Sequence, residues 1–375
     1  MAASQYRVTM FPVQAPRAVL VAALALALAG CGPTPLPPGS PSGANAQGPS
    51  QAPSPAPTVV ASVQPDPLID LDCSDFAGVA SIGTIAGVTE RDPRGAVAEM
   101  LDVVSLADIV RNAGGVACEF SDGGEWRVTN ADGGYPLNTS WRGAAIFIVP
   151  NVAAAAESLI SDSSCGDLTN SRSNVCQVDF AAGTSWVTVV SSSSDRGTTF
   201  RAVRDHVRGI VERAASQAGP IAREPGTFHP PRDCASLVPT AKVAALLGGS
   251  DVSADRSIQL QVAAEATFVT ENTGCDWWRD TGDSLAQVHV YPGGAWAAAL
   301  TLSGLSATAV ELDGILDNDT ALSHCTDVSA EDFWICTAEV VVDGTWLRAT
   351  GIGPDEATST TIAVAMAEAV LSHRG

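Results

Sequence analysis

The segment Cys234-Ala-Ser-Leu-Val-Pro-Thr-Ala-Lys-Val-Ala-Ala-Leu246 aligns without a gap with Cys73-Ser-Asp-Phe-Ala-Gly-Val-Ala-Ser-Ile-Gly-Thr-Ile85. Each segment opens a set of four cysteines. The gaps between successive cysteines are 45, 47 and 11 residues in the first set and 41, 50 and 11 in the second. Repeated spacing of this kind indicates two copies of one unit. The sequence therefore predicts tandem domains over residues 67–218 and 219–375, with a Pro-rich joint at the start of the second.

Both copies show the same order of local patterns, which predicts an α+β fold with an antiparallel sheet packed against helices. The predicted elements of the first copy are a helix over 76–85, an extra helix over 97–110, a strand around Cys118, a strand over 144–149, an Ala-rich helix over 151–160, a hairpin around Gly183-Thr184 and a closing helix over 200–211. Those of the second copy are a helix over 237–247, a strand around Cys275, a strand over 286–291, an Ala-rich helix over 294–302, a hairpin around Asp343-Gly344 and a closing helix over 362–370. Asp-Gly favours a type I′ turn, and a leading Gly suits type II′.

The eight cysteines of the two sets are expected to be oxidised, because an export signal precedes them. Four cysteines allow three pairings in each copy. We favour first with second and third with fourth, since the 11-residue gap recurs as a local staple requires. The predicted disulfides are Cys73–Cys118, Cys165–Cys176, Cys234–Cys275 and Cys325–Cys336. A zinc site is the alternative, but no Cys-x-x-Cys occurs, so no metal is expected.

Residues 1–30 are predicted to be a signal peptide, with Arg7 and Arg17 before Cys31 and an apolar run of 11 residues over 18–28. Leu28-Ala-Gly-Cys31 resembles the lipobox of bacterial lipoproteins, which implies that Cys31 is lipidated and holds the chain on the outer face of the cell membrane. The alternative is an ordinary secretory signal whose cysteine is incidental. Met10 is an alternative start.

Residues 31–66 are predicted to be a disordered tether. Ten of residues 32–66 are proline, and Asp66 is their only charged residue. Such a stretch cannot bury apolar surface and stays extended, reaching on the order of 100 Å at about 3.1 Å per residue.

The composition excludes one class of partner. Asp and Glu number 41 against 20 Lys and Arg, which gives a net charge of −21. Nucleic-acid binding needs a basic surface, so no nucleic-acid partner is expected. Hydrophobic residues make up 46%, which is enough for a packed core.

The sequence shows no catalytic motif: it contains no Gly-x-Ser-x-Gly, His-Glu-x-x-His, Walker loop or Ser-x-x-Lys. We expect neither catalysis nor a cofactor. The five histidines, at 206, 229, 289, 324 and 373, are expected to be ordinary helix, strand or surface residues. The acidic groups at 317–319 and 66–75 do not fit the EF-hand spacing, so solvated turns are favoured over Ca²⁺ sites.

Basic residues gather on the closing helix of the first copy. Arg201, Arg204 and Arg208 share one helical face at i, i+3 and i+7. One interpretation is a solvated face that pairs with local acids such as Asp205 and Glu212. The other is a docking face for the second copy or for an anionic envelope polymer.

The run from Asp233 to Gly248, the later Thr273-Gly-Cys-Asp-Trp277 and the lipobox together resemble actinobacterial lipoproteins of the DUF3558 type, a family of unknown function. The cysteine layout is also similar to that of extracytoplasmic sensor domains of some bacterial kinases. The match is weaker in the first copy, where Phe76-Ala-Gly replaces the apolar-Pro-Thr run. The resemblance implies no catalytic residues.

Three functions are compatible with these features. The first is a non-enzymatic envelope lipoprotein with a ligand- or partner-binding, sensor-like role. A ligand would lie within one copy, near Pro150 or Pro292, or at the joint 219–233. The second is a structural or accessory subunit of a cell-envelope complex, and the third is a hydrolase with a scattered triad. We favour the first, since a duplicated, disulfide-stapled domain on a long tether suits the presentation of a binding surface.

Overall fold

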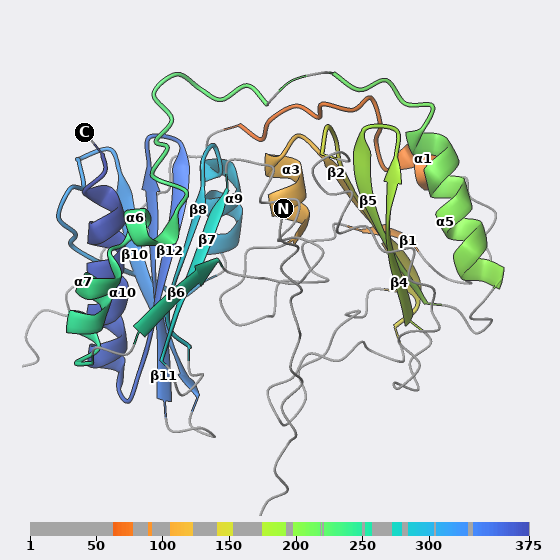
Figure 1. The fold of residues 1–375 in the computed structure, drawn as a ribbon. Coiled ribbons are helices and arrows are strands. Elements are labelled where there is room, and N and C mark those ends of the chain that lie inside the picture. Colours follow the sequence, from red (N-terminus) through yellow and green to blue (C-terminus); the bar gives the residue numbers. More distant parts are fainter. Residues whose placement is uncertain are drawn as a thin grey trace, which may run out of the picture. The chain divides into compact units, whose positions relative to one another are not determined.

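The structure is a computed structural model that describes residues 63–77, 89–91, 106–122, 141–152, 175–192, 198–217, 219, 221–249, 252–256, 272–279, 284–303, 305–328 and 333–374. Residues 55–375 form one compact unit. This unit contains helices and two antiparallel sheets, so the fold class is α+β (Figure 1). None of the described helices is long and apolar enough to cross a membrane.

The first sheet has five described strands in the spatial order β1-β2-β3-β5-β4, all antiparallel. Their bounds are Thr89–Arg91 (β1), Val116–Ser121 (β2), Gly143–Val149 (β3), Val175–Ala182 (β4) and Ser185–Ser192 (β5). Helix α5 (Thr198–Val211) lies along one face of this sheet (Figure 1). Its Val203 and Val207 are fully buried with Ile146 of β3, which accounts for the apolar stripe that predicted this helix.

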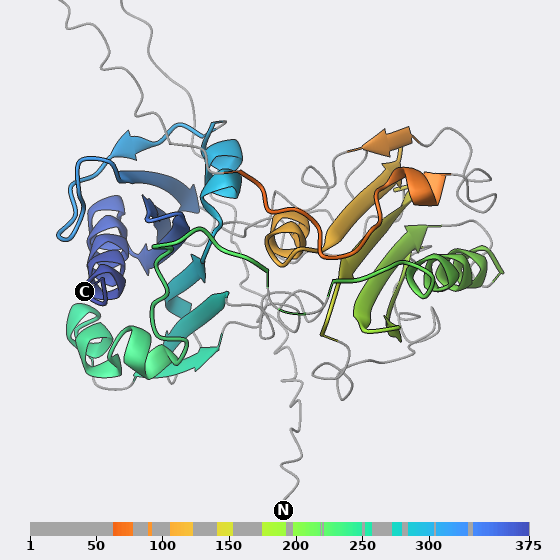
Figure 2. The same cartoon turned by 90° about the horizontal axis from the view of Figure 1, so that it is seen from above.

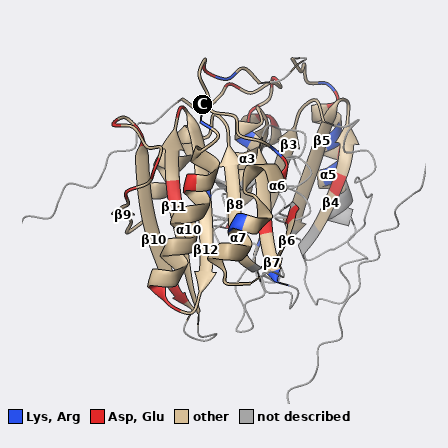
Figure 3. Cartoon of the chain, turned by 60° about the vertical axis from the view of Figure 1, so that its left-hand side comes forward, with Lys and Arg blue, Asp and Glu red and all other residues tan. Residues whose placement is uncertain are grey.

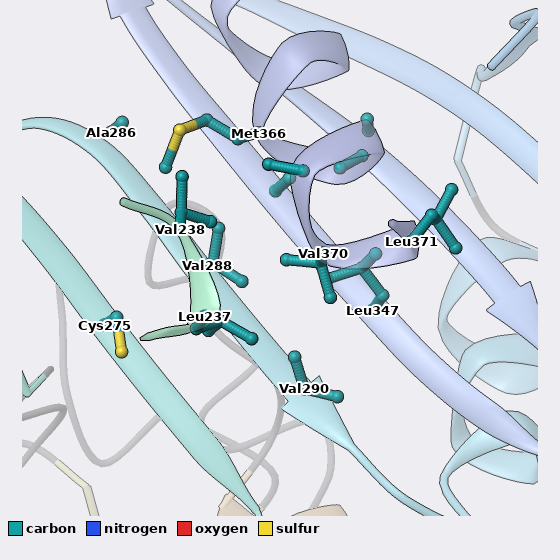
Figure 4. Close-up of a cluster of buried hydrophobic side chains, with 14 of the residues drawn as sticks. Leu237, Val238, Cys275, Ala286, Val288, Val290, Leu347, Met366, Val370 and Leu371 are labelled. Carbon is teal, nitrogen blue, oxygen red and sulfur yellow. The ribbon is translucent and has the colours of Figure 1, made fainter. Parts of the chain in front are cut away.

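The second sheet has seven described strands in the order β6-β7-β8-β12-β11-β10-β9. Their bounds are Val252–Arg256 (β6), Thr273–Arg279 (β7), Ser284–Tyr291 (β8), Thr308–Ala309 (β9), Thr320–Val328 (β10), Phe333–Val342 (β11) and Thr345–Gly353 (β12). Helix α10 (Glu356–Leu371) packs against one face of this sheet (Figure 2). Figure 4 shows Met366 and Val370 of α10 beside Val288 of β8 and Leu347 of β12, within a cluster of buried side chains.

Shorter helices complete the described part. They are α1 (Ser74–Ala77), α3 (Leu106–Asn112), α6 (Cys234–Leu237), α7 (Thr240–Leu246) and α9 (Ala295–Leu302). Another buried cluster joins both halves of the chain: it includes Phe147 and Trp186 from the first sheet and Trp296 and Trp346 from the second half. The face of each sheet that carries Trp186 or Trp346 is called its inner face below, because it lies opposite the face covered by α5 or α10.

The predicted helix over 237–247 is wrong in one respect, because it forms as two short helices. Asp233 caps α6 by accepting a hydrogen bond from the Ser236 amide, and α6 ends at Leu237. Pro239 has no amide hydrogen and disfavours a helical residue before it. Val238 is accordingly extended, and the chain restarts as α7 at Thr240.

Other predicted elements agree with the structure where it describes them. Asp343 and Gly344 both have positive φ, 45° and 71°, as a type I′ turn requires. Gly183 has a φ of 59°, which suits the first central position of a type II′ turn. Of the helix predicted over 97–110, residues 106–110 are helical within α3, which extends to Asn112, and residues 97–105 lie outside the described residues. So do most of the helices predicted over 76–85 and 151–160.

Three of the four expected cysteine pairs are disulfides in the structure: Cys73–Cys118, Cys234–Cys275 and Cys325–Cys336. The first two tie the start of a half to its first central strand, β2 or β7. The third links β10 to β11 at directly opposite positions, 4.1 Å apart between Cα atoms. Cys165, Cys31 and the rest of the signal and tether before residue 63 lie outside the described residues.

Candidate binding site at the joint between the halves

Asn112, the last residue of α3, connects the first half to the second. Its side chain is buried, and its Nδ2 donates hydrogen bonds to Oδ1 of Asn272, at 3.2 Å, and to the carbonyl of Pro292, at 3.1 Å. Asn272 immediately precedes β7, and Pro292 immediately follows β8. One amide group therefore joins the end of a first-half helix to two strand ends of the second half.

Arg223, in the joint, is held against the same residue. Its Nη1 donates to Asn112 Oδ1 at 3.0 Å, and its Nη2 donates to the Asn112 carbonyl at 2.9 Å. Gly293, with a φ of 71°, allows this placement, because a Cβ there would lie 2.7 Å from Nη1 of Arg223. The guanidinium of Arg223 is thus held in position by two hydrogen bonds to Asn112 and by the close approach of the Gly293 backbone.

A cavity of about 230 Å³ opens beside this guanidinium. Its lining comes from the end of the predicted tether, the joint and two turns of the second half: Val63, Gln64, Pro65, Asp66, Ala222, Arg223, Glu224, Thr227, Gly293 and Gly344. The volume is below the roughly 300–1,000 Å³ typical of drug-sized ligand sites. The cavity therefore suits a small ligand with polar groups, since its wall combines a guanidinium, two carboxylates and a hydroxyl.

The joint itself is anchored on the second half. Thr345 Oγ1 donates to the Phe228 carbonyl at 2.7 Å, and the Phe228 amide donates to the Asp343 carbonyl at 3.2 Å. The Thr227 hydroxyl donates to the Glu224 carbonyl at 2.7 Å. These bonds fix the joint residues on the hairpin turn of β11 and β12 and so define one wall of the cavity.

A second polar feature lies on the inner face of the second sheet. The buried carboxylate of Glu339 accepts from Trp346 Nε1 at 2.8 Å and from Arg348 Nε at 2.9 Å, and His324 Nε2 lies 3.2 Å from its Oε1. In Figure 3 the strands of this sheet are largely uncharged, with an acidic position within β11. Burial raises the pKa of Glu339, but the Arg348 charge and the hydrogen bonds from His324 and Arg348 outweigh it, so the pKa lies below its ordinary value.

His289 lies directly opposite Arg348 on the neighbouring strand β8. Its ring stacks on that of Tyr291, with 6.4 Å between centroids. Burial, and secondarily the Arg348 charge, lowers the pKa of His289 to about 3. The imidazole is therefore neutral at physiological pH, and the charged pair beside it is Glu339 with Arg348.

The first sheet carries a weaker version of this arrangement. Asp179 and Thr188 are opposite one another on β4 and β5, as Glu339 and Arg348 are on β11 and β12. Thr188 Oγ1 donates to Asp179 Oδ1 at 2.6 Å, and burial raises the pKa of Asp179. Among the described residues, none accepts a hydrogen bond from the buried Nε1 of Trp186. The sequence signal for these pairs, an acid amid an alternating strand, is visible only once the register is known.

The arginine row on α5 makes local contacts. Arg204 Nε donates to Asp205 Oδ1 at 2.9 Å, and the Arg208 guanidinium lies 4.7 Å from the centroid of the Phe180 ring. The side chain of Arg201 lies outside the described part of the molecule. Arg204 thus pairs with a local acid, and a docking role for this face stays a prediction.

The predicted histidines and acidic groups are dispersed. His373 Nε2 lies 2.9 Å from the Leu237 carbonyl, and Asp319 accepts from Arg374. Asp72 accepts hydrogen bonds from the Ser74 hydroxyl at 2.5 Å and from the Ser74 amide at 2.7 Å, and these bonds lower the pKa of its carboxyl. Among the described residues, no three His, Cys, Asp or Glu side chains are grouped so that they could hold a metal ion.

Comparison with known proteins adds no relative to this picture: no protein-family model matches the chain, and neither a curated protein nor a solved structure matches it.

Proposed function

We propose that this protein is an extracytoplasmic lipoprotein, anchored through Cys31, whose folded part binds a small ligand or a partner without catalysis. The lipobox at 28–31 and the proline-rich stretch that follows it support the anchor and the tether. The joint cavity beside Arg223 is the observation that carries the binding role.

We infer further that residues 67–218 and 219–375 are tandem copies of a domain of the DUF3558 type. The spatial order β2-β3-β5-β4 in the first sheet matches β7-β8-β12-β11 in the second, since in both the third and fourth of these strands along the chain exchange places across the sheet; among the described strands, β9 and β10 are additional in the second. Equivalent disulfides, Cys73–Cys118 and Cys234–Cys275, join the start of each half to the first strand of this order. Both observations support a duplication, because topology and covalent cross-links agree with the cysteine spacing.

The cavity is the predicted ligand site. Arg223 is already ordered by Asn112 and Gly293, so a ligand that contacts it does not have to immobilise a flexible side chain. Because the lining comes from four segments of the chain, an occupant bridges segments that are far apart in the sequence. Binding is therefore expected to stabilise the joint against opening.

A thermal-shift screen on the full chain carrying Cys31→Ser tests this proposal. The probes are free amino acids, monosaccharides, small organic acids and inorganic phosphate. At least one class should raise the melting temperature of the parent chain but not that of Ala222→Phe, whose ring fills the cavity. The matched control Ala202→Phe changes an exposed position of α5 and should keep the shift. A shift that survives in Ala222→Phe would place the ligand elsewhere.

The absence of catalysis is tested on the same protein. Ester, peptide and glycoside panels are expected to show no turnover. A rate that persists through purification and disappears with a single Ser, His or Asp substitution would instead establish a hydrolase.

A further inference from the structure

The residues between the predicted tether and α1 are integrated into the fold by a small set of contacts. We call residues 63–71 the strap (Figure 1, orange, before α1). The Leu68 amide donates to the Gly114 carbonyl at 2.8 Å, the Gln217 amide to the Leu68 carbonyl at 2.7 Å and the Asp70 amide to the Ala215 carbonyl at 2.9 Å. The strap belongs to neither sheet, since its pairing is the isolated antiparallel bridge between Ile69 and Ser216.

The strap also supplies side chains to the end of α3 and to the first-half core. Ile69 is 2% exposed and packs in the cluster under α5. Leu68 covers Gly114, where a Cβ would lie 2.7 Å from its Cγ and 3.1 Å from Cδ1 of Ile221 in the joint. The strap thus fastens the chain that leaves α5 to the turn that follows α3.

Two boundaries limit what moves if the strap detaches. On its C-terminal side, Cys73 is bonded to Cys118 of β2, so the chain stays attached to the sheet there. On its N-terminal side, Val63, Gln64, Pro65 and Asp66 form one wall of the joint cavity. Detachment breaks no sheet hydrogen bond, yet it removes that wall.

We propose that the strap is a releasable latch that opens by local unfolding while both sheets stay intact, and that its release opens the joint cavity toward the tether. The strap is held by three backbone hydrogen bonds, the buried side chain of Ile69 and the partly buried Leu68 and Leu71. A segment with so few contacts belongs to the least stable cooperative units of a fold. Nine residues released from the strap lengthen the tether by about 30 Å at about 3.3 Å per residue. Only the use of this latch by a tethered protein rests on the function proposed above; its opening does not.

Hydrogen exchange on the full chain carrying Cys31→Ser tests the latch. The amides of Leu68, Asp70 and Gln217 should exchange at one common rate, at least tenfold faster than the amides of β3 and β8. The variant Ile69→Asp should accelerate these three amides further and leave β3 and β8 unchanged. Val63→Asp is the matched control, because Val63 is 83% exposed and should have no effect on them.

A covalent lock provides the converse test. Ile69 and Ser216 form a non-hydrogen-bonded antiparallel pair, whose Cα separation of about 4.5 Å falls within the range of disulfides. The oxidised double variant Ile69→Cys/Ser216→Cys should slow the three amides at least tenfold. Two results would overturn the proposal, because each would show that the strap is an inseparable part of the domain. One is that these amides exchange at the β3 rate in the parent chain. The other is that Ile69→Asp accelerates exchange throughout the first sheet.

Discussion

The indole nitrogen of Trp346 donates a 2.8 Å hydrogen bond to Oε2 of Glu339 across the hairpin of β11 and β12. The same carboxylate also receives Arg348 and contacts His324, so it connects side chains of three adjacent strands, β10, β11 and β12. In the first sheet, Asp179 is one methylene shorter and bonds Thr188 instead. The two carboxyl groups therefore differ in their partners, since Glu339 pairs with a charged guanidinium and Asp179 with a neutral hydroxyl.

Glu339→Gln is expected to lower the free energy of unfolding by about 3–5 kcal/mol, because it leaves the guanidinium of Arg348 buried without a counter-charge. Urea denaturation at neutral pH measures this. Asp179→Asn is the matched control in the first sheet and should cost less, since its partner Thr188 is neutral. Equal losses for the two variants would contradict a special role for the ion pair.

His289 is expected to make stability depend on pH. Its pKa is about 3 in the folded chain, against about 6.5 when unfolded, so acid protonates the unfolded chain first. The contribution of His289 to the free energy of unfolding is complete above about pH 6.5 and decreases as the pH falls toward 3. Between pH 6.5 and 4.5 the loss is about 2–3 kcal/mol, at about 1.4 kcal/mol per pH unit.

The measurement is the unfolding free energy at pH 7.5 and 4.5 for the parent chain and for His289→Gln. The variant should lose less stability between the two pH values. The exposed His206→Gln is the control and should behave like the parent. A slope that is unchanged in His289→Gln would assign the pH dependence to other groups. The pKa of Glu339 lies below its ordinary value in the folded chain, so its own contribution is lost only as the pH falls below about 4.5.

The two disulfides of the second half are expected to contribute according to the logarithm of the length of the loop that each closes, 41 and 11 residues. Replacing Cys234 and Cys275 by Ser should cost about 4 kcal/mol, and replacing Cys325 and Cys336 about 3 kcal/mol. Thermal unfolding of the two double variants checks the order. Peptide mapping without reduction should also find Cys165–Cys176, and a bridge between the two halves would refute the predicted domain division.

Lipidation of Cys31 predicts that metabolic fatty-acid labelling follows the parent protein. Cys31→Ser should abolish the label and leave a protein that is uncleaved or released from the membrane. Cys325→Ser, which changes a disulfide-bonded cysteine of the folded part, should keep the label. Label that persists in Cys31→Ser would refute the lipoprotein anchor.

Much of the fold follows from local patterns. The Asp343-Gly344 turn, the apolar stripe of α5 and the strand that ends just before Pro292 are determined by residues close in sequence, so spacing alone predicts them. Proline stops a helix, so Pro239 indicated a break between α6 and α7. The apolar periodicity continues on both sides of it, however, and led to the prediction of a single helix. Strand β10, which lies between β11 and β9, was not predicted, since Thr320–Val328 mixes polar and apolar residues without clean alternation.

The site depends on contacts between distant residues, and no local pattern reports them. Asn112 meets Asn272 and Pro292 across 160 and 180 residues of sequence. Arg223 was one unremarkable residue of a Pro-rich joint, and its significance comes from the carbonyl at the end of α3. The sequence could point to the joint, but only the tertiary arrangement identifies the side chains that surround the cavity.

The Cys73–Cys118 bond also determines how the protein bears mechanical load. A pull from the N-terminal side acts first on the strap and then reaches Cys73, where the covalent bond transmits tension directly to β2. That strand has β1 on one side and β3 on the other, so the tension is shared between two ladders. Helix α1, which follows Cys73 in the chain, is bypassed. The protein can therefore remain folded under a tension that exceeds what the strap alone withstands.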